Sequence, residues 1–151
     1  MFASEELLYV TDHGLTVRAH AMLAAARAYF VGHQEAVGAL FIEHGVQYPM
    51  FLKSGYEGGP WGGTQRGSVP RGRGWGFTSG GPSQGNIATH VEGHASAVMW
   101  QRTAGYAVLI VDRPMCSVCH RSLHATLPPN STLVVYSDEE GRTIVRASHA
   151  R

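Results

Sequence analysis

The sequence predicts an α/β fold, in which helices pack against a layered sheet. The main observation is the order of elements after Asn86, where apolar segments alternate as helix, strand, helix, strand and strand. The second is Tyr106–Val111, an unbroken apolar run with the length of a strand buried on both faces. The third is size, because 151 residues with 44% hydrophobic content suffice for one packed core. We therefore expect residues 1–151 to form a single domain.

The first part of this domain, residues 1–53, is expected to be largely helical. Residues 16–44 are rich in alanine and predict one or two helices with an apolar stripe facing the core. The stripe recurs at three- and four-residue spacing and consists of Met22, Leu23, Ala26, Tyr29 and Phe30. Val46–Lys53 predicts a short strand, and Pro49 confines it to an edge or a bulge of the sheet.

Residues 54–85 differ in composition and hold most of the 19 glycines of the chain. The segment contains both arginines and tryptophans: Trp61, Arg66, Arg71, Arg73 and Trp75. Such a mixture suits a nucleic-acid strand, because arginine neutralises phosphate and aromatic faces stack on bases. The alternative is a surface loop without a ligand, and the composition alone leaves both open.

Residues 86–151 hold the densest pattern of elements. One helix is expected to begin at Thr89, and Pro114 is expected to open a second helix with Cys116 and Cys119 in its first turn. The other boundaries follow from prolines and turn residues: the second helix ends near 128–129, and strands lie at 133–137 and 143–147 on either side of a turn.

His90, Cys116 and Cys119 are ligands of the kind that Zn²⁺ prefers, and three protein ligands leave the fourth tetrahedral position open for water. Glu92 is not needed to hold the metal, so its carboxylate is free to move protons beside that water. His-x-Glu followed by Cys-x-x-Cys is typical of zinc-dependent nucleobase deaminases. In that pattern a proline directly precedes the first cysteine, whereas here Met115 separates Pro114 from Cys116.

Other interpretations of these residues fit less of the pattern. Thr89 and Glu92 also form a capping box, which gives the cysteine pair no role. His90 and His94 have the spacing of a zinc protease, but Val91 occupies the place of its glutamate. Cys116–His120 matches the haem attachment motif, yet no export signal accompanies it, and a thioredoxin-like pair would leave the histidine box unused. A purely structural zinc site is the strongest alternative, with His94, His120 or His124 as fourth ligand.

Charge and hydropathy single out no other class of protein. The net charge is +1, so bulk charge favours no particular partner. No apolar run approaches the ~20 residues of a membrane span. Glu5 and Glu6 stand where a signal peptide would carry positive charge, so we expect no signal peptide in this chain. With two cysteines three residues apart, a disulfide scaffold is not expected, and we expect a monomer.

The chain also resembles a known family, the bacterial polymorphic-toxin cytosine deaminases of the double-stranded DNA deaminase toxin (DddA-like) type. The resemblance covers Phe77–Val135 and rests on Thr78–Pro82, the box His90–Gly93, the cysteine pair and Leu127–Asn130. It implies a cytidine deaminase-like three-layer α/β/α sandwich around a mixed, about five-stranded sheet. It also implies a toxin module of a larger secreted protein, which acts in the target-cell cytoplasm and has a cognate immunity protein as partner.

Carried over residue by residue, the resemblance makes His90, Cys116 and Cys119 zinc ligands and Glu92 the proton shuttle. The segments beside these residues are candidate substrate-binding walls: Phe77, Ser79, Gly80, Gly81, Pro114 and Met115. We therefore expect a zinc-dependent deaminase that converts cytosine to uracil in single- or double-stranded DNA. A deaminase of free nucleosides or bases and a non-catalytic, zinc-stabilised nucleic-acid-binding module are the alternatives.

Overall fold

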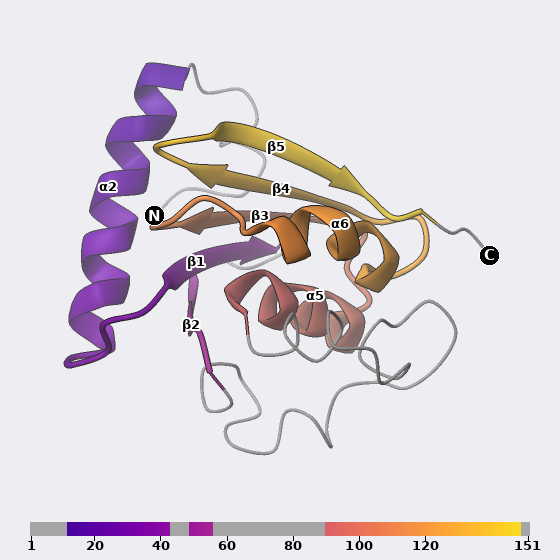
Figure 1. Ribbon diagram of the computed structural model, residues 1–151, viewed down its shortest axis with the longest axis horizontal. Helices are drawn as coiled ribbons and strands as arrows, with labels where there is room; N and C mark the ends of the chain where they lie inside the picture. The colour runs from indigo at the N-terminus through magenta and orange to yellow at the C-terminus, as the bar shows by residue number, and fades with distance from the viewer. Residues whose placement is uncertain (1–11, 43–48, 56–89, 149–151) are drawn as a thin grey trace.

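The computed structural model describes residues 12–42, 49–55 and 90–148, with no account of the side chains of residues 12–18. Figure 1 shows these residues as helices on a twisted sheet. The elements in chain order are α2 (Asp12–Tyr29), β1 (Val37–Ile42), β2 (Met50–Lys53), α5 (Val91–Arg102), β3 (Tyr106–Val111), α6 (Ser117–Thr126), β4 (Thr132–Ser137) and β5 (Gly141–Arg146). Among the described residues, no helix is long and apolar enough to cross a membrane.

The sheet has five strands in the order β2-β1-β3-β4-β5. Only β3 and β4 run parallel, joined through α6, and the other neighbouring pairs are antiparallel. Helix α2 covers one face, whereas α5 and α6 cover the other (Figure 1). This is the mixed, five-stranded α/β/α arrangement expected of a cytidine deaminase-like fold.

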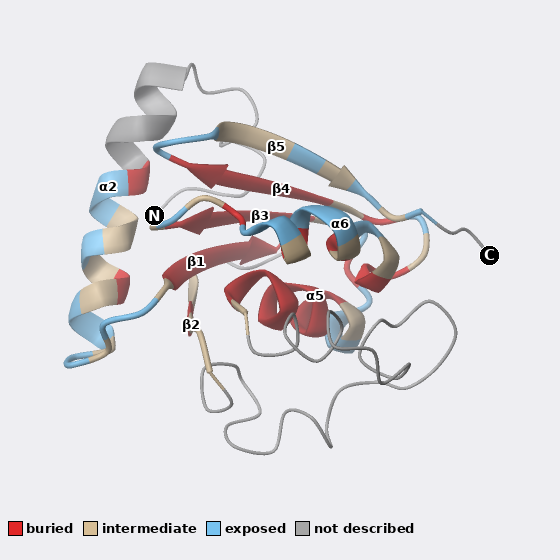
Figure 2. Ribbon diagram, in the orientation of Figure 1, coloured by how far each residue is buried: buried red, intermediate tan, exposed pale blue. Residues whose placement is uncertain are grey.

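The core lies on both faces of the central strands, which are buried along their length (Figure 2). Successive side chains of a strand point to opposite faces. In β1, Leu40 and Ile42 therefore pack under α5 and α6, and Ala39 and Phe41 pack under α2. The expectation that Tyr106–Val111 is buried on both faces is confirmed.

The prediction of helices over 16–44 is wrong beyond Tyr29. The chain leaves α2 through a left-handed Gly32 (φ 86°) and then forms the buried strand β1 over Val37–Ile42. The run Val-Gly-Ala-Leu-Phe-Ile is continuously apolar, and such a short run has the pattern of a strand buried on both faces as well as that of a helix. The strand expected at 46–53 is present over Met50–Lys53 as β2, at the sheet edge; Pro49 lies just before it, and residues 46–48 are outside the described part of the chain.

The second metal-site helix begins later than predicted. Its N-cap is Cys116, in extended conformation, and α6 starts at Ser117, so Pro114 lies outside the helix. Met115 explains the difference: its side chain is buried, and its backbone N–H donates to Oε1 of Glu140 (2.8 Å). These contacts hold the residues before Cys116 away from helical geometry.

The start of α5 lies close against the sheet because β1 has no side chain at Gly38. A Cβ atom there would lie 2.8 Å from Cγ1 of Val91 and 2.9 Å from the carbonyl oxygen of Ile110. The neighbour of Val91 is His90, the N-cap of α5, whose own side chain does not cap the helix. Gly38 therefore allows α5 to place His90 and Glu92 directly over the sheet.

Candidate metal centre

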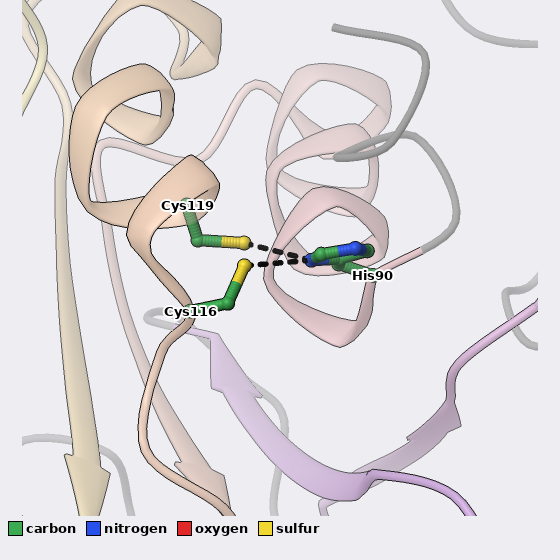
Figure 3. A group of neighbouring side chains, drawn as sticks. All are labelled: His90, Cys116 and Cys119. Carbon is green, nitrogen blue, oxygen red and sulfur yellow. Dashed lines mark hydrogen bonds between the residues drawn. The ribbon is translucent and has the colours of Figure 1, made fainter. Parts of the chain in front are cut away.

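Three potential ligands meet where α5 and α6 begin. His90 and Cys116 are the N-cap residues of the two helices, and Cys119 lies in the first turn of α6. Nδ1 of His90 is 3.1 Å from Sγ of Cys119 and 3.5 Å from Sγ of Cys116, and all three atoms lie within 4.8 Å of one another. Figure 3 shows the ring nitrogen facing both sulfur atoms.

This geometry fits a tetrahedral zinc ion. With Zn–N of about 2.0–2.1 Å and Zn–S of about 2.3 Å, a ligand nitrogen and a ligand sulfur lie about 3.5 Å apart. The separations around His90 are near that value, and the donor set is nitrogen and sulfur, which zinc prefers over harder cations. Both cysteines lie at the N-terminus of α6, a position that favours the binding of anionic ligands and metal-bound thiolates.

The ionisation of these groups depends on burial. Burial lowers the pKa of His90, which keeps the imidazole neutral and able to ligate a metal. Burial, and then the neighbouring carboxylate of Glu92, raise the pKa of the Cys119 thiol. Binding of zinc must therefore displace a proton from Cys119, so we expect metal affinity to rise with pH.

Glu92 lies in the first turn of α5 and is 6% exposed. Burial raises the pKa of its carboxyl group, and a hydrogen bond from Cys119 acts in the opposite direction. A raised pKa makes the carboxyl group easier to protonate than an exposed glutamate, which suits a group that must both take up and release a proton. Glu92 therefore has the environment of a general acid–base group.

A pocket of about 350 Å³ opens over the metal group, within the size range of small-molecule sites. Its described lining comes from the loop before β1, the end of β2, the start of α5 and the segment after β3. The residues are Glu35, Ala36, Ser54, Gly55, His90, Val91, Glu92, Arg113, Pro114 and Cys116.

A family model described as SCP1.201-like deaminase matches residues 14–151, most of the chain. The chain belongs to the SCP1.201-like deaminase family. No curated protein matches it at a significant level. The family match supports a deaminase, and the narrower DddA-like toxin type stays a prediction.

In this SCP1.201-like deaminase, several predicted site residues come together. His90, Glu92, Cys116 and Pro114 all line the pocket, and Cys119 completes the possible metal group. Met115 does not line it, because its side chain belongs to the hydrophobic core. The remaining predicted contacts lie outside the described residues: Phe77, Ser79, Gly80, Gly81, Arg66, Arg71, Arg73, Trp61 and Trp75.

The candidates for a fourth protein ligand are occupied or remote. Nε2 of the buried His94 donates to the carbonyl oxygen of Gly55 (2.8 Å), and burial lowers the pKa of His94 to about 4. Nε2 of His120 lies 2.8 Å from Oε2 of Glu140, and His124 is exposed. Within the described ranges, only His90, Cys116 and Cys119 form a group able to bind a metal, which leaves one tetrahedral position open.

Sequence reasoning missed three residues of the pocket lining: Glu35, Ser54 and Arg113. Oγ of Ser54 donates to Oε2 of Glu35 (3.3 Å), and Arg27 donates to the carbonyl oxygen of Glu35 (2.9 Å). Arg113 carries a weak signal, because it follows the carboxyl end of a buried strand, where α/β folds bind ligands. Glu35 and Ser54 belong to no motif, and their role depends on how β1 and β2 pair.

Proposed function

We propose that this protein is a zinc-dependent cytosine deaminase that acts on DNA. One observation carries the proposal: the buried carboxyl group of Glu92 lines a pocket together with His90 and Cys116 of a His-Cys-Cys group, in a chain of a deaminase family. A structural zinc site would require neither an open fourth position nor a buried acid beside it.

The chemistry is a hydrolytic replacement of an amine. A bound zinc ion would lower the pKa of water to about 7 and so supply a nucleophile at neutral pH. The carboxylate of Glu92 accepts the proton of the attacking water and donates it to N3 of cytosine as the new C4–O bond forms. Glu92 then takes the proton of the new C4 hydroxyl group and passes it to the amino group, the C4–N bond breaks as the C4=O bond forms, and uracil and ammonia are released.

The choice of DNA rests on the resemblance to the double-stranded DNA deaminase toxins around Thr78–Pro82, His90–Gly93 and Leu127–Asn130. On the same resemblance we propose that the protein is a toxin module that acts in the target-cell cytoplasm and is neutralised by an immunity protein. A base must leave the stack to reach such a pocket, so the surrounding loops decide which nucleic acid is accepted.

Matched oligonucleotides test the substrate. Single- and double-stranded DNA and RNA of one sequence would be incubated with the zinc-loaded protein and sequenced for C-to-U and A-to-I changes. We expect C-to-U changes in DNA, and none with Glu92→Gln. If no strand is converted but ammonia is released from cytidine, the protein is a nucleoside deaminase and the DNA proposal is wrong.

Residues 54–85 supply a second test, of strand binding. If Arg66, Arg71 and Arg73 contact phosphates, replacing all three with alanine in a Glu92→Gln background should weaken binding to every sequence. Each lost contact should reduce the log–log salt slope by about 0.7 for single strands or 0.9 for duplexes. Trp61→Ala and Trp75→Ala should each cost about 1–3 kcal/mol if bases stack there. Identical salt slopes would reject this segment as a phosphate-binding element.

A further inference from the structure

Arg113 has a position that the deamination chemistry leaves unused. It follows β3, precedes Pro114 and lines the pocket with an exposed side chain. Among the described lining residues it is the only lysine or arginine, and the acids that share the pocket are Glu35 and Glu92. A polyanionic substrate that enters this pocket therefore meets two carboxyl groups and one permanent positive charge.

The neighbouring acid does not neutralise Arg113. Oδ2 of Asp112 pairs with Nη2 of Arg27, and Oδ1 accepts a hydrogen bond from the backbone N–H of Val37 (3.0 Å). Arg113 instead donates from Nη2 to the carbonyl oxygen of Gln34, which is uncharged. No ion pair between Arg113 and a described carboxylate is present. Its charge is thus not compensated by the described part of the chain.

The loop around Gln34, to which Arg113 donates, is held in place by a second arginine. Nη1 of Arg27 donates to the carbonyl oxygens of His33 (2.5 Å) and Glu35 (2.9 Å), the residues on either side of Gln34. Arginine side chains therefore hold three successive carbonyl groups, and the loop before β1 is tied to the end of β3. One N–H group of Arg113 is committed to this loop, which orients the guanidinium group beside the pocket and leaves its other donors for a ligand.

We propose that Arg113 binds a backbone phosphate next to the target cytidine and so positions the strand at the pocket mouth. The proposal rests on the proposed function, because only a nucleic-acid strand brings a phosphodiester to this site. A guanidinium group with several free donors matches the oxygen geometry of phosphate and offsets the repulsion from Glu35 and Glu92. A contact of this kind orients the strand and reads no sequence.

The test removes the charge from one partner at a time. Single-turnover deamination would be measured on oligonucleotides with a neutral methylphosphonate on the 5′ or the 3′ side of the target. For the native protein we expect about tenfold or more slowing at one of the two positions, which is the effect of one charge-assisted hydrogen bond. Arg113→Gln keeps an amide donor for Gln34 and should be slow on the natural strand, with no further slowing at that position.

Two further variants make the result specific. Arg113→Lys keeps the positive charge but lacks the paired N–H donors of the guanidinium group. It should recover part of the rate together with part of the sensitivity to the neutral linkage. Arg102→Ala removes an equal charge from an exposed site at the far end of α5 and should behave as the native protein. Zinc content and unfolding curves of all variants would show that each one is folded.

The outcomes separate the two proposals. The decisive quantity is the ratio of the rate on the natural strand to the rate on the strand with one neutral linkage. If the strand is deaminated and Arg113→Gln has the same ratio as the native protein at both positions, Arg113 does not bind phosphate. If the native protein converts no oligonucleotide, the proposed function fails, and the role of Arg113 falls with it.

Discussion

Glu92 and His94 are two buried titratable residues of α5 that serve different parts of the pocket. Glu92 interacts with Cys119 and lines the pocket. His94 reaches the carbonyl oxygen of Gly55, so it ties α5 to the segment after β2 that forms another pocket wall. Glu92 is therefore placed to move protons, and His94 to hold the wall in position.

Glu92→Gln should abolish deamination while zinc stays bound, because the side chain transfers protons and does not ligate the metal. General acid–base groups contribute typically 10²–10⁴-fold, and a residue that handles several transfers belongs at the upper end of that range. Glutamine has nearly the same size, so the fold should persist. Single-turnover rates and metal analysis measure both quantities. Near-native turnover would disprove the mechanism, and loss of zinc would make Glu92 a ligand.

His94 should make stability depend on pH. Its pKa is about 4 in the folded protein, against about 6.5 in an unfolded chain. Between these values the unfolded state binds more protons, so the free energy of unfolding falls as the pH falls from about 6.5 to about 4. The loss should approach about 3 kcal/mol for this fully buried side chain.

Urea unfolding across this pH range measures the effect. His94→Gln keeps a donor for Gly55 and cannot titrate, so its stability should fall less steeply than that of the native protein. His124→Gln alters an exposed histidine and serves as the control, with the native pH dependence. Parallel curves for the native protein and His94→Gln would show that His94 does not carry the effect.

At the scale of elements, the turn between β4 and β5 supports the metal site. Glu140 accepts the backbone N–H of Met115 through Oε1 and pairs with His120 through Oε2. These two residues adjoin Cys116 and Cys119 in the sequence, so one carboxylate holds both ends of the cysteine segment. We therefore expect the turn to help position the two cysteines.

Glu140→Ala should weaken zinc binding by about 10–100-fold, the usual effect of losing a partner that orients metal ligands. Glu140→Gln retains an acceptor for Met115 and should lose less affinity. Competition with a zinc chelator measures the change. Glu139→Ala, an exposed neighbour on the same turn, is the matched control. Equal zinc affinity for Glu140→Ala and Glu139→Ala would remove Glu140 from the support of the site.

Some elements were predictable from sequence because their signals are local. Tyr106–Val111 is apolar, of strand length and bounded by polar residues, and β3 has those limits. β1 was missed because Val37–Ile42 is equally apolar but follows a helical stripe. Only its pairing with β2 on one side and β3 on the other shows that it is a strand. The start of α6 was missed because a proline suggests a first helical residue, whereas a long-range bond to Glu140 decides it.

At the scale of the whole molecule, the order of the strands in the sheet brings the residues of the pocket together. The possible metal group was predictable because each of its residues lies in a short motif, and the fold needs only to bring two helix starts together. Glu35, Ser54 and Arg113 lie in three separate loops. They share a pocket because β1 pairs with both β2 and β3, which no local pattern encodes.

Zinc should also matter to the whole fold, because an ion held by His90, Cys116 and Cys119 would join the start of α5 to the start of α6. The free energy of metal binding is coupled to folding, so removal of zinc should lower stability as well as activity. Cys119→Ala should reproduce both losses, since it removes a ligand that is buried between the helices. Unfolding curves with and without metal give the size of this coupling.

The most direct measurement is a titration of zinc into metal-free protein, with bound metal and C-to-U conversion of a DNA oligonucleotide followed in the same samples. We expect conversion to rise in proportion to bound zinc and to level off at one ion per chain, the capacity of the group formed by His90, Cys116 and Cys119. Full conversion by protein without metal, or conversion that does not follow zinc occupancy, would contradict the account.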